Sequence, residues 1–110
     1  TIRPLTPLPV PTTPVVIDGF TQPGAAPNTN PFGQPSNAHL LIELDGSLAG
    51  SGLTLRHGGV VRGLVLNRFA DYAVGGGGDT RAMIEGCYIG TDVTGAQALG
   101  NGTGVYHSYV

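Results

Sequence analysis

Charged residues are scarce in this chain of 110 amino acids, of which only 11% are Asp, Glu, Lys or Arg. Lysine is absent and the arginines are scattered, so the chain lacks the basic stripe that neutralises phosphates in nucleic-acid-binding proteins. Its single cysteine, Cys87, excludes an internal disulfide and a zinc site made of cysteines. No apolar run approaches the roughly 20 residues that a membrane-spanning helix requires. We therefore expect no nucleic-acid partner and no membrane span.

Glycine and proline are abundant instead. The chain contains 19 glycines and 9 prolines, while 40% of its residues are apolar. The apolar content argues against a disordered low-complexity chain. Short strands joined by tight turns would use both kinds of residue, because glycine and proline favour turns and apolar side chains fill a core. The composition thus predicts an all-β fold, and the length allows one domain.

Two stretches are expected to be irregular. Residues 1–14 carry prolines at positions 4, 7, 9, 11 and 14, and proline cannot donate a backbone hydrogen bond to a sheet. This segment is predicted to be a Pro-rich N-terminal arm or cap. Residues 20–38 are rich in Pro, Asn and Gly, which predicts a long surface loop. The loop lies within the remaining region, 15–110, which is repetitive.

Four short apolar segments recur in this region, and their third residues are separated by 27, 22 and 23 positions. The segments are VVIDG from Val15, IELDG from Ile42, LVLNR from Leu64 and CYIGT from Cys87. Repeats of this length are typical of solenoids, in which each repeat forms one coil. The fourth residues would form one column of turn positions, made of Asp18, Asp45, Asn67 and Gly90.

Stacking the segments predicts two inward columns and one outward column, because strand side chains alternate between faces. The inward columns are Val15, Ile42, Leu64, Cys87 and Ile17, Leu44, Leu66, Ile89; the outward column is Val16, Glu43, Val65, Tyr88. A fainter second register aligns Leu53–Leu55, Ala73–Val74 and Val105–Tyr106 as another face of the same coil. Together these columns predict a parallel β-helix of about four to five coils with two open ends.

Two motifs, VIDGFTQPG at 16–24 and YIGTDVTG at 88–95, resemble repeats of large bacterial secreted and cell-surface proteins. The similarity extends from Thr1 to about Val105. It implies the right-handed, single-stranded parallel β-helix of the pectate-lyase-like superfamily and an extracellular or cell-surface location. It transfers no catalytic residues, because these repeats are scaffold motifs. Cys87 replaces a usual asparagine, and YHSYV at the C-terminus departs from the usual continuation.

The glycine-rich stretch from Gly86 to Gly104 allows two interpretations. Asp92, Asn101 and backbone carbonyls would be ligands for calcium, which takes six to eight oxygens. However, Asp92 is the only carboxylate after Glu85, and a phosphate loop would require a lysine followed by a helix. We therefore favour a corner between two strands. The same reasoning assigns the glycines at 75–78 to a flexible corner.

Acid–base catalysis requires convergent carboxylates or a histidine with a partner. Asp18 and Asp45 would lie about 5 Å apart if their turns were consecutive in the stack, although we favour local turn hydrogen bonding as their role. Arg62 and Glu85 are 23 residues apart and should stack as a surface ion pair of small energetic effect. The histidines show no metal-ligand spacing. We expect no enzyme activity, no metal and no cofactor.

Tyrosines are the remaining candidates for recognition, because their rings can stack on sugars. Tyr88, Tyr106 and Tyr109 are the candidate contacts for a carbohydrate or another partner. The leading hypothesis is a non-catalytic extracellular β-solenoid structural or surface module. It would self-associate end to end through its open ends, into a filament, since unpaired strand edges recruit further strands. A carbohydrate-binding module and a fragment of a polysaccharide lyase or hydrolase are the alternatives.

Overall fold

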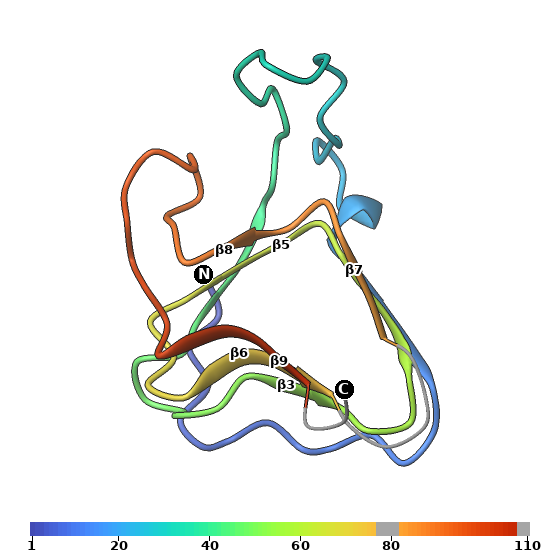
Figure 1. Ribbon diagram of the computed structural model, residues 1–110, viewed down its shortest axis with the longest axis vertical. Coiled ribbons are helices and arrows are strands. Elements are labelled where there is room, and N and C mark those ends of the chain that lie inside the picture. Colours follow the sequence, from blue (N-terminus) through green and yellow to red (C-terminus); the bar gives the residue numbers. More distant parts are fainter. Residues whose placement is uncertain (77–81, 108–110) are drawn as a thin grey trace.

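The computed structural model describes residues 1–76 and 82–107 (Figure 1). The regular structure of these residues consists of short strands and one turn of 3-10 helix, η1. In chain order the elements are β1 (Val15–Asp18), η1 (Gly19–Thr21), β2 (Ile42–Asp45), β3 (Leu53–Leu55), β4 (Gly59–Arg62), β5 (Leu64–Asn67), β6 (Tyr72–Gly76), β7 (Ala82–Glu85), β8 (Tyr88–Ile89) and β9 (Thr103–His107). The all-β prediction is confirmed for the described residues.

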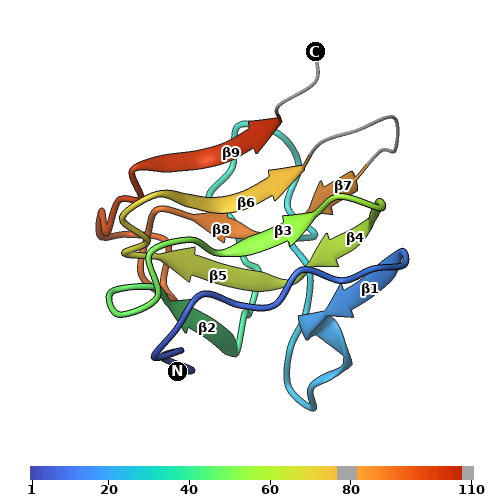
Figure 2. The same cartoon turned by 90° about the horizontal axis from the view of Figure 1, so that it is seen from below.

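The strands form three parallel sheets. The first sheet has the strand order β1-β4-β7, the second β2-β5-β8 and the third β3-β6-β9. Successive strands therefore enter the first, second and third sheets in turn, and the chain passes through this order three times. The sheets form three sides around a shared interior in Figure 1, and Figure 2 shows the strands stacked in the perpendicular direction. The parallel stacking expected from the repeats is thus confirmed.

The second and third sheets show the alignments expected from the sequence. In the second sheet, Leu44 pairs with Leu66, and Leu66 pairs with Ile89. In the third sheet, Leu53 pairs with Val74. Leu66 and Val74 are at most 1% exposed. Like apolar residues therefore lie above one another and build one core between the sheets.

The prediction that placed β1 in the same column as β2 is wrong. β1 pairs in register with β4, and β4 pairs with β7. Asp18 and Asp45 are therefore not consecutive turn residues, and the pair of neighbouring carboxylates does not form. A Cβ atom on Gly19 would lie 2.2 Å from the carbonyl oxygen of Gly63, so the backbone at this corner leaves no room for a side chain at position 19. The motif VIDG belongs with the glycine corners that follow β4 and β7.

The edge of β2 that β1 would have occupied is taken by the N-terminal segment. Ile2 forms a parallel bridge with Leu44. The Ile2 N–H donates to the Glu43 carbonyl over 2.7 Å, and the Asp45 N–H donates to the Ile2 carbonyl over 2.9 Å. Residues 4–14 then run beneath the stack towards β1 (Figure 2). One end of the stack is therefore partly covered by the chain's own first residues.

The outward face of the second sheet is more enclosed than the outward face of the first sheet. Val65 and Glu43 point away from the core, yet they are only 0% and 8% exposed. Figure 1 shows that the loops at 22–41 and 90–102 both rise from this side. In the first sheet the outward Val16 is 70% exposed. The outward column expected from the sequence is thus divided between a covered and an open face.

Candidate functional site

The loop at 90–102 is held together by hydrogen bonds to one carboxylate. Oδ1 of Asp92 accepts hydrogen bonds from the Thr94 hydroxyl at 2.6 Å, the Thr94 N–H at 3.0 Å and the Ala96 N–H at 3.3 Å. These donors, the Thr94 hydroxyl foremost, hold the pKa of Asp92 below its ordinary value. The carboxylate thus organises its own turn.

Asn101 fixes the other end of the same loop. Its Oδ1 accepts from the Phe69 N–H at 2.9 Å, and its Nδ2 donates to the Leu66 carbonyl at 3.2 Å. Asp92 and Asn101 therefore bind different backbone groups, which is consistent with the predicted corner between two strands. Among residues 1–76 and 82–107, no group of three or more His, Cys, Asp or Glu side chains is placed to hold a metal ion. The second glycine stretch, 75–78, lies partly outside these residues.

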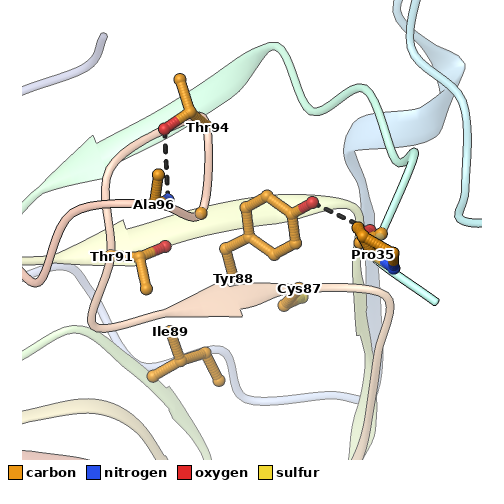
Figure 3. Close-up of a pocket in the computed structure, with 9 residues that line it drawn as sticks. Pro35, Cys87, Tyr88, Ile89, Thr91, Thr94 and Ala96 are labelled. Carbon is orange, nitrogen blue, oxygen red and sulfur yellow. Dashed lines mark hydrogen bonds between the residues drawn. The ribbon is translucent and has the colours of Figure 1, made fainter. Parts of the chain in front are cut away.

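A cleft opens between the two loops over the second sheet, and we name it the loop cleft. Its walls are residues 35–41 and 91–96, and its floor is Cys87–Ile89. It consists of two adjoining hollows of about 390 Å³ each, which share Ser36, Tyr88 and Thr94 as lining residues. Figure 3 shows the Tyr88 ring standing between the two walls, where its hydroxyl donates to Ser36 Oγ at 3.0 Å. Tyr88 therefore points outward as predicted, but into a cleft.

Cys87 is part of the floor of this cleft. It packs against the core, as its inward position in the sequence pattern predicts, and it is a free thiol. Burial raises the pKa of the thiol, which keeps it protonated and unreactive at neutral pH.

Tyr106 lies on another side of the molecule from Tyr88, because it belongs to β9 of the third sheet. Its ring stacks on Tyr72 with centroids 6.1 Å apart and an angle of 19° between the planes. The Tyr72 hydroxyl shares a hydrogen bond of 2.6 Å with Thr54 Oγ1. A hollow of about 290 Å³ is lined by these two rings together with Asp71 and Thr103. The structure therefore separates Tyr106 from Tyr88 and joins it to Tyr72, while Tyr109 lies outside the described residues.

Glu43 and Asn67 form a buried polar contact beneath the loops. Oε2 of Glu43 accepts from Asn67 Nδ2 at 2.8 Å, and Oε1 accepts from the Thr1 hydroxyl at 2.6 Å. The Thr1 and Asn67 hydrogen bonds lower the pKa of Glu43 against the opposing effect of burial. Asn67 Nδ2 also donates to the Thr91 carbonyl at 2.9 Å. This contact joins the first residue of the chain to the loop that follows β8.

Asp45 is the second buried carboxylate, with an exposed fraction of 1%. Its Oδ2 accepts from Arg3 at 3.0 Å and from Arg68 at 3.1 Å, and its Oδ1 accepts from the Ser47 N–H at 2.9 Å. Burial would raise the pKa of Asp45, but the Ser47 and Arg3 hydrogen bonds outweigh it and lower the pKa to about 2. The expected turn bond is present. The two arginine contacts are not visible in the sequence, because their residues lie far from Asp45 along the chain.

The expected ion pair between Arg62 and Glu85 is confirmed on the first sheet. Arg62 Nε lies 3.5 Å from Glu85 Oε1 and 3.7 Å from Asp18 Oδ1, although neither approach has hydrogen-bond geometry. The Arg62 guanidinium also lies over the Phe20 ring, 5.3 Å from its centroid. These side chains gather at one corner of the stack.

No protein-family model, curated protein or solved structure matches this chain. Helical structure among the described residues is one short turn, and no helix there has the length and apolar character to cross a membrane. Any function must therefore be argued from the strand edges, the hollows and the side chains themselves.

Proposed function

We propose that this chain is a right-handed parallel β-helix that serves as a non-catalytic, extracellular structural module. Three passes through the same three parallel sheets, with like residues in register, support the β-helix. Each return to a sheet is a crossover between parallel strands, and such connections are right-handed in about 98% of cases. The extracellular location rests on the resemblance of the two motifs to bacterial surface proteins.

The observation that carries a structural role is the state of the strand edges at the end formed by β7, β8 and β9. Within the described residues, each of these strands has one paired neighbour and one free edge. Their inward side chains are incompletely covered: Ile84 and Ile89 are partly buried, and Val105 is 52% exposed. Unpaired edges beside apolar side chains recruit further strands. This end is therefore a surface on which another coil can stack.

A second copy of the chain is the proposed occupant of this end. The opposite end is partly covered by Ile2 and by the proline-rich residues 4–14, which have few N–H groups to offer. Contact between two like ends therefore leaves fewer backbone groups unpaired than contact between unlike ends. The end contact by itself therefore produces a pair of molecules and not an unlimited filament.

Sedimentation at increasing concentration tests this role. Val105→Glu places a charge on the free end and should remove the end-to-end part of the association, whereas Val16→Glu, on the exposed side of the first sheet, should leave the association unchanged. A Val105→Glu protein that associates like the Val16→Glu control would exclude the end surface. A wild-type protein that stays monomeric would refute the proposed role.

Carbohydrate binding is a second candidate function, at Tyr106, one of the three tyrosines that the sequence indicated. The stacked Tyr72–Tyr106 pair adjoins the hydroxyl of Thr103 and the carboxylate of Asp71, and Tyr106 is 50% exposed. An aromatic face beside hydrogen-bonding groups suits a sugar ring, which has apolar faces and polar edges. Retention on immobilised polysaccharides that is lost in Tyr106→Ala and kept in Met83→Ala would support it. Equal retention of both variants, or none of the wild type, would count against it.

A further inference from the structure

The loop between η1 and β2 contains a compact segment, residues 27–38, that we name the finger. Asn28 Oδ1 accepts from the Asn30 N–H at 3.1 Å and the Asn37 N–H at 3.0 Å. Asn37 Oδ1 accepts from the Thr29 N–H at 2.8 Å, and Asn30 Nδ2 donates to the Pro35 carbonyl at 2.7 Å. An antiparallel bridge between residues 26 and 39 closes the base. The finger is therefore held in shape by its own asparagines.

A tight turn at the end of the finger presents one aromatic side chain. The Gln34 N–H donates to the Pro31 carbonyl at 3.1 Å, and Gly33 has a φ of 93°. Positive φ at the third residue is the signature of a type II turn, which places Phe32 at the second position. The Phe32 side chain is fully exposed, at 107% of the reference area. The exposed Phe32 ring adds no hydrophobic stabilisation to the folded monomer. Burial of the ring against a partner would be favourable.

The loop cleft offers a matching site on the same side of the molecule. Figure 1 shows that the finger and the loop at 90–102 both rise from the side of the second sheet. The hollow on the side of residues 38–41 has a volume of about 390 Å³ and exposes Leu41 and Val93, at 41% and 43%. Tyr88 also lines this hollow, so an entering ring would meet both aliphatic and aromatic partners.

The finger and the cleft both contain few charged residues. No Asp, Glu, Lys or Arg occurs between Asp18 and Glu43, and Asp92 is the only one of these residue types along the cleft wall 91–96. Two copies of this face would therefore meet without like-charge repulsion. The lack of lysine and arginine in the finger, together with its single aromatic residue, makes a lipid surface a poorer partner, since stable membrane binding needs several apolar or basic side chains.

We propose that two copies of the chain associate side by side by exchanging fingers, so that Phe32 of each copy enters the loop cleft of the other beside Tyr88. Because finger and cleft lie on one face, the exchange is reciprocal about a twofold axis, as in most homodimers. The contact is small and belongs to the weak, transient class of interfaces. It involves a different face from the free strand edges at β7, β8 and β9.

A tryptophan reporter tests the exchange, because the chain contains no tryptophan. In Phe32→Trp, fluorescence emission should shift to the blue as the protein concentration rises from about 1 μM to about 1 mM, the range in which a weak dimer forms. Leu48→Trp is the matched control, since Leu48 is 56% exposed in a corner away from the finger and should give no shift. Emission that is the same at all concentrations, or blue-shifted even when dilute, would overturn the proposal.

A blocked cleft separates finger exchange from other contacts of Phe32. Adding Val93→Arg to Phe32→Trp keeps the reporter and puts a charge on the cleft wall, so the blue shift should disappear. Phe32→Ala should weaken this dimer about 100-fold or more, because each buried ring contributes at least about tenfold and the interface contains two. A blue shift that survives Val93→Arg would place Phe32 elsewhere. Adding Val105→Glu to Phe32→Trp should leave the shift intact, which distinguishes the finger from end stacking.

Discussion

Arg68 Nη1 donates to Oδ2 of Asp45 at 3.1 Å, which joins the corners that follow two successive strands of the second sheet. Arg68 has a φ of 62°, the only positive φ of a non-glycine residue among those described. A side chain in the left-handed region costs about 1 kcal/mol, so the backbone at this corner is held by its surroundings. Arg3 reaches the same Oδ2 from the N-terminal segment. Asp45 thus joins two passes of the chain to its N-terminal segment.

Asp45 should make stability depend on acid pH. Its pKa in the folded protein is about 2, against an ordinary value of 3.8. Because the folded pKa is lowered, the stabilisation is fully present above about pH 4 and is lost as pH falls towards 2. The difference corresponds to about 2 kcal/mol in the free energy of unfolding. Urea denaturation measured at a series of pH values should show this loss.

Asp45→Asn should lower stability by about 2 kcal/mol at pH 7 and flatten the acid limb of the profile. Asp71→Asn, the same substitution at an exposed corner, is the matched control. An acid limb that is as steep in Asp45→Asn as in the wild type would show that other carboxylates cause it, with Glu43 the next to examine.

Asn67 should be the least replaceable of the turn residues. It is 0% exposed and its Nδ2 donates to both Glu43 and the Thr91 carbonyl, while its Oδ1 has no partner. Asn67→Asp removes the donor and sets a carboxylate against that of Glu43. We expect a loss of about 3–5 kcal/mol at pH 7, as for a buried charge left without a partner. Thermal denaturation at pH 7 measures it.

The same amide-to-acid change at an exposed site provides the control for Asn67. Gln97→Glu lies on the outer loop and should change stability by less than about 0.5 kcal/mol. Equal stability of the two variants at pH 7 would mean that the Asn67 contacts contribute nothing.

The second and third sheets were predictable because each strand shows its inward residues by alternation and the strands recur at nearly constant intervals. Leu44, Leu66 and Ile89 follow one another at intervals of 22 and 23, and each lies in a strand with alternating inward residues. The first sheet was assigned wrongly because VIDG and ELDG look alike, whereas the partners of VIDG, which are VVRG and MIEG, share with it only two hydrophobic positions and a glycine. Gly19 is required because the backbone of Gly63, 44 residues later in the chain, passes close to it. A single sequence does not show that contact.

The site was less predictable than the fold. Tyr88 and Tyr106 were identified by residue type, but the sequence could not show that they belong to different sheets or that Ser36 closes over Tyr88. The finger was recognised only as a loop. Its one available signal was PFG at 31–33, a turn sequence with an aromatic residue at the centre, and its significance depends on the exposure of Phe32.

The corner glycine Gly63 should tolerate no side chain. Its φ is 70°, and a Cβ atom there would lie 2.9 Å from both the backbone nitrogen and Cγ of Phe20. Gly63→Ala should therefore lower the free energy of unfolding by about 1–3 kcal/mol, because strain and steric overlap act together. Gly100→Ala is the matched control: a Cβ on Gly100 meets nothing within 4 Å, so stability should be unchanged or slightly higher. In calorimetry the difference should exceed about 4 °C in Tm. Equal Tm values for the two variants would mean that Phe20 can shift away from the corner at no cost. That result would refute the close packing between the first and second sheets.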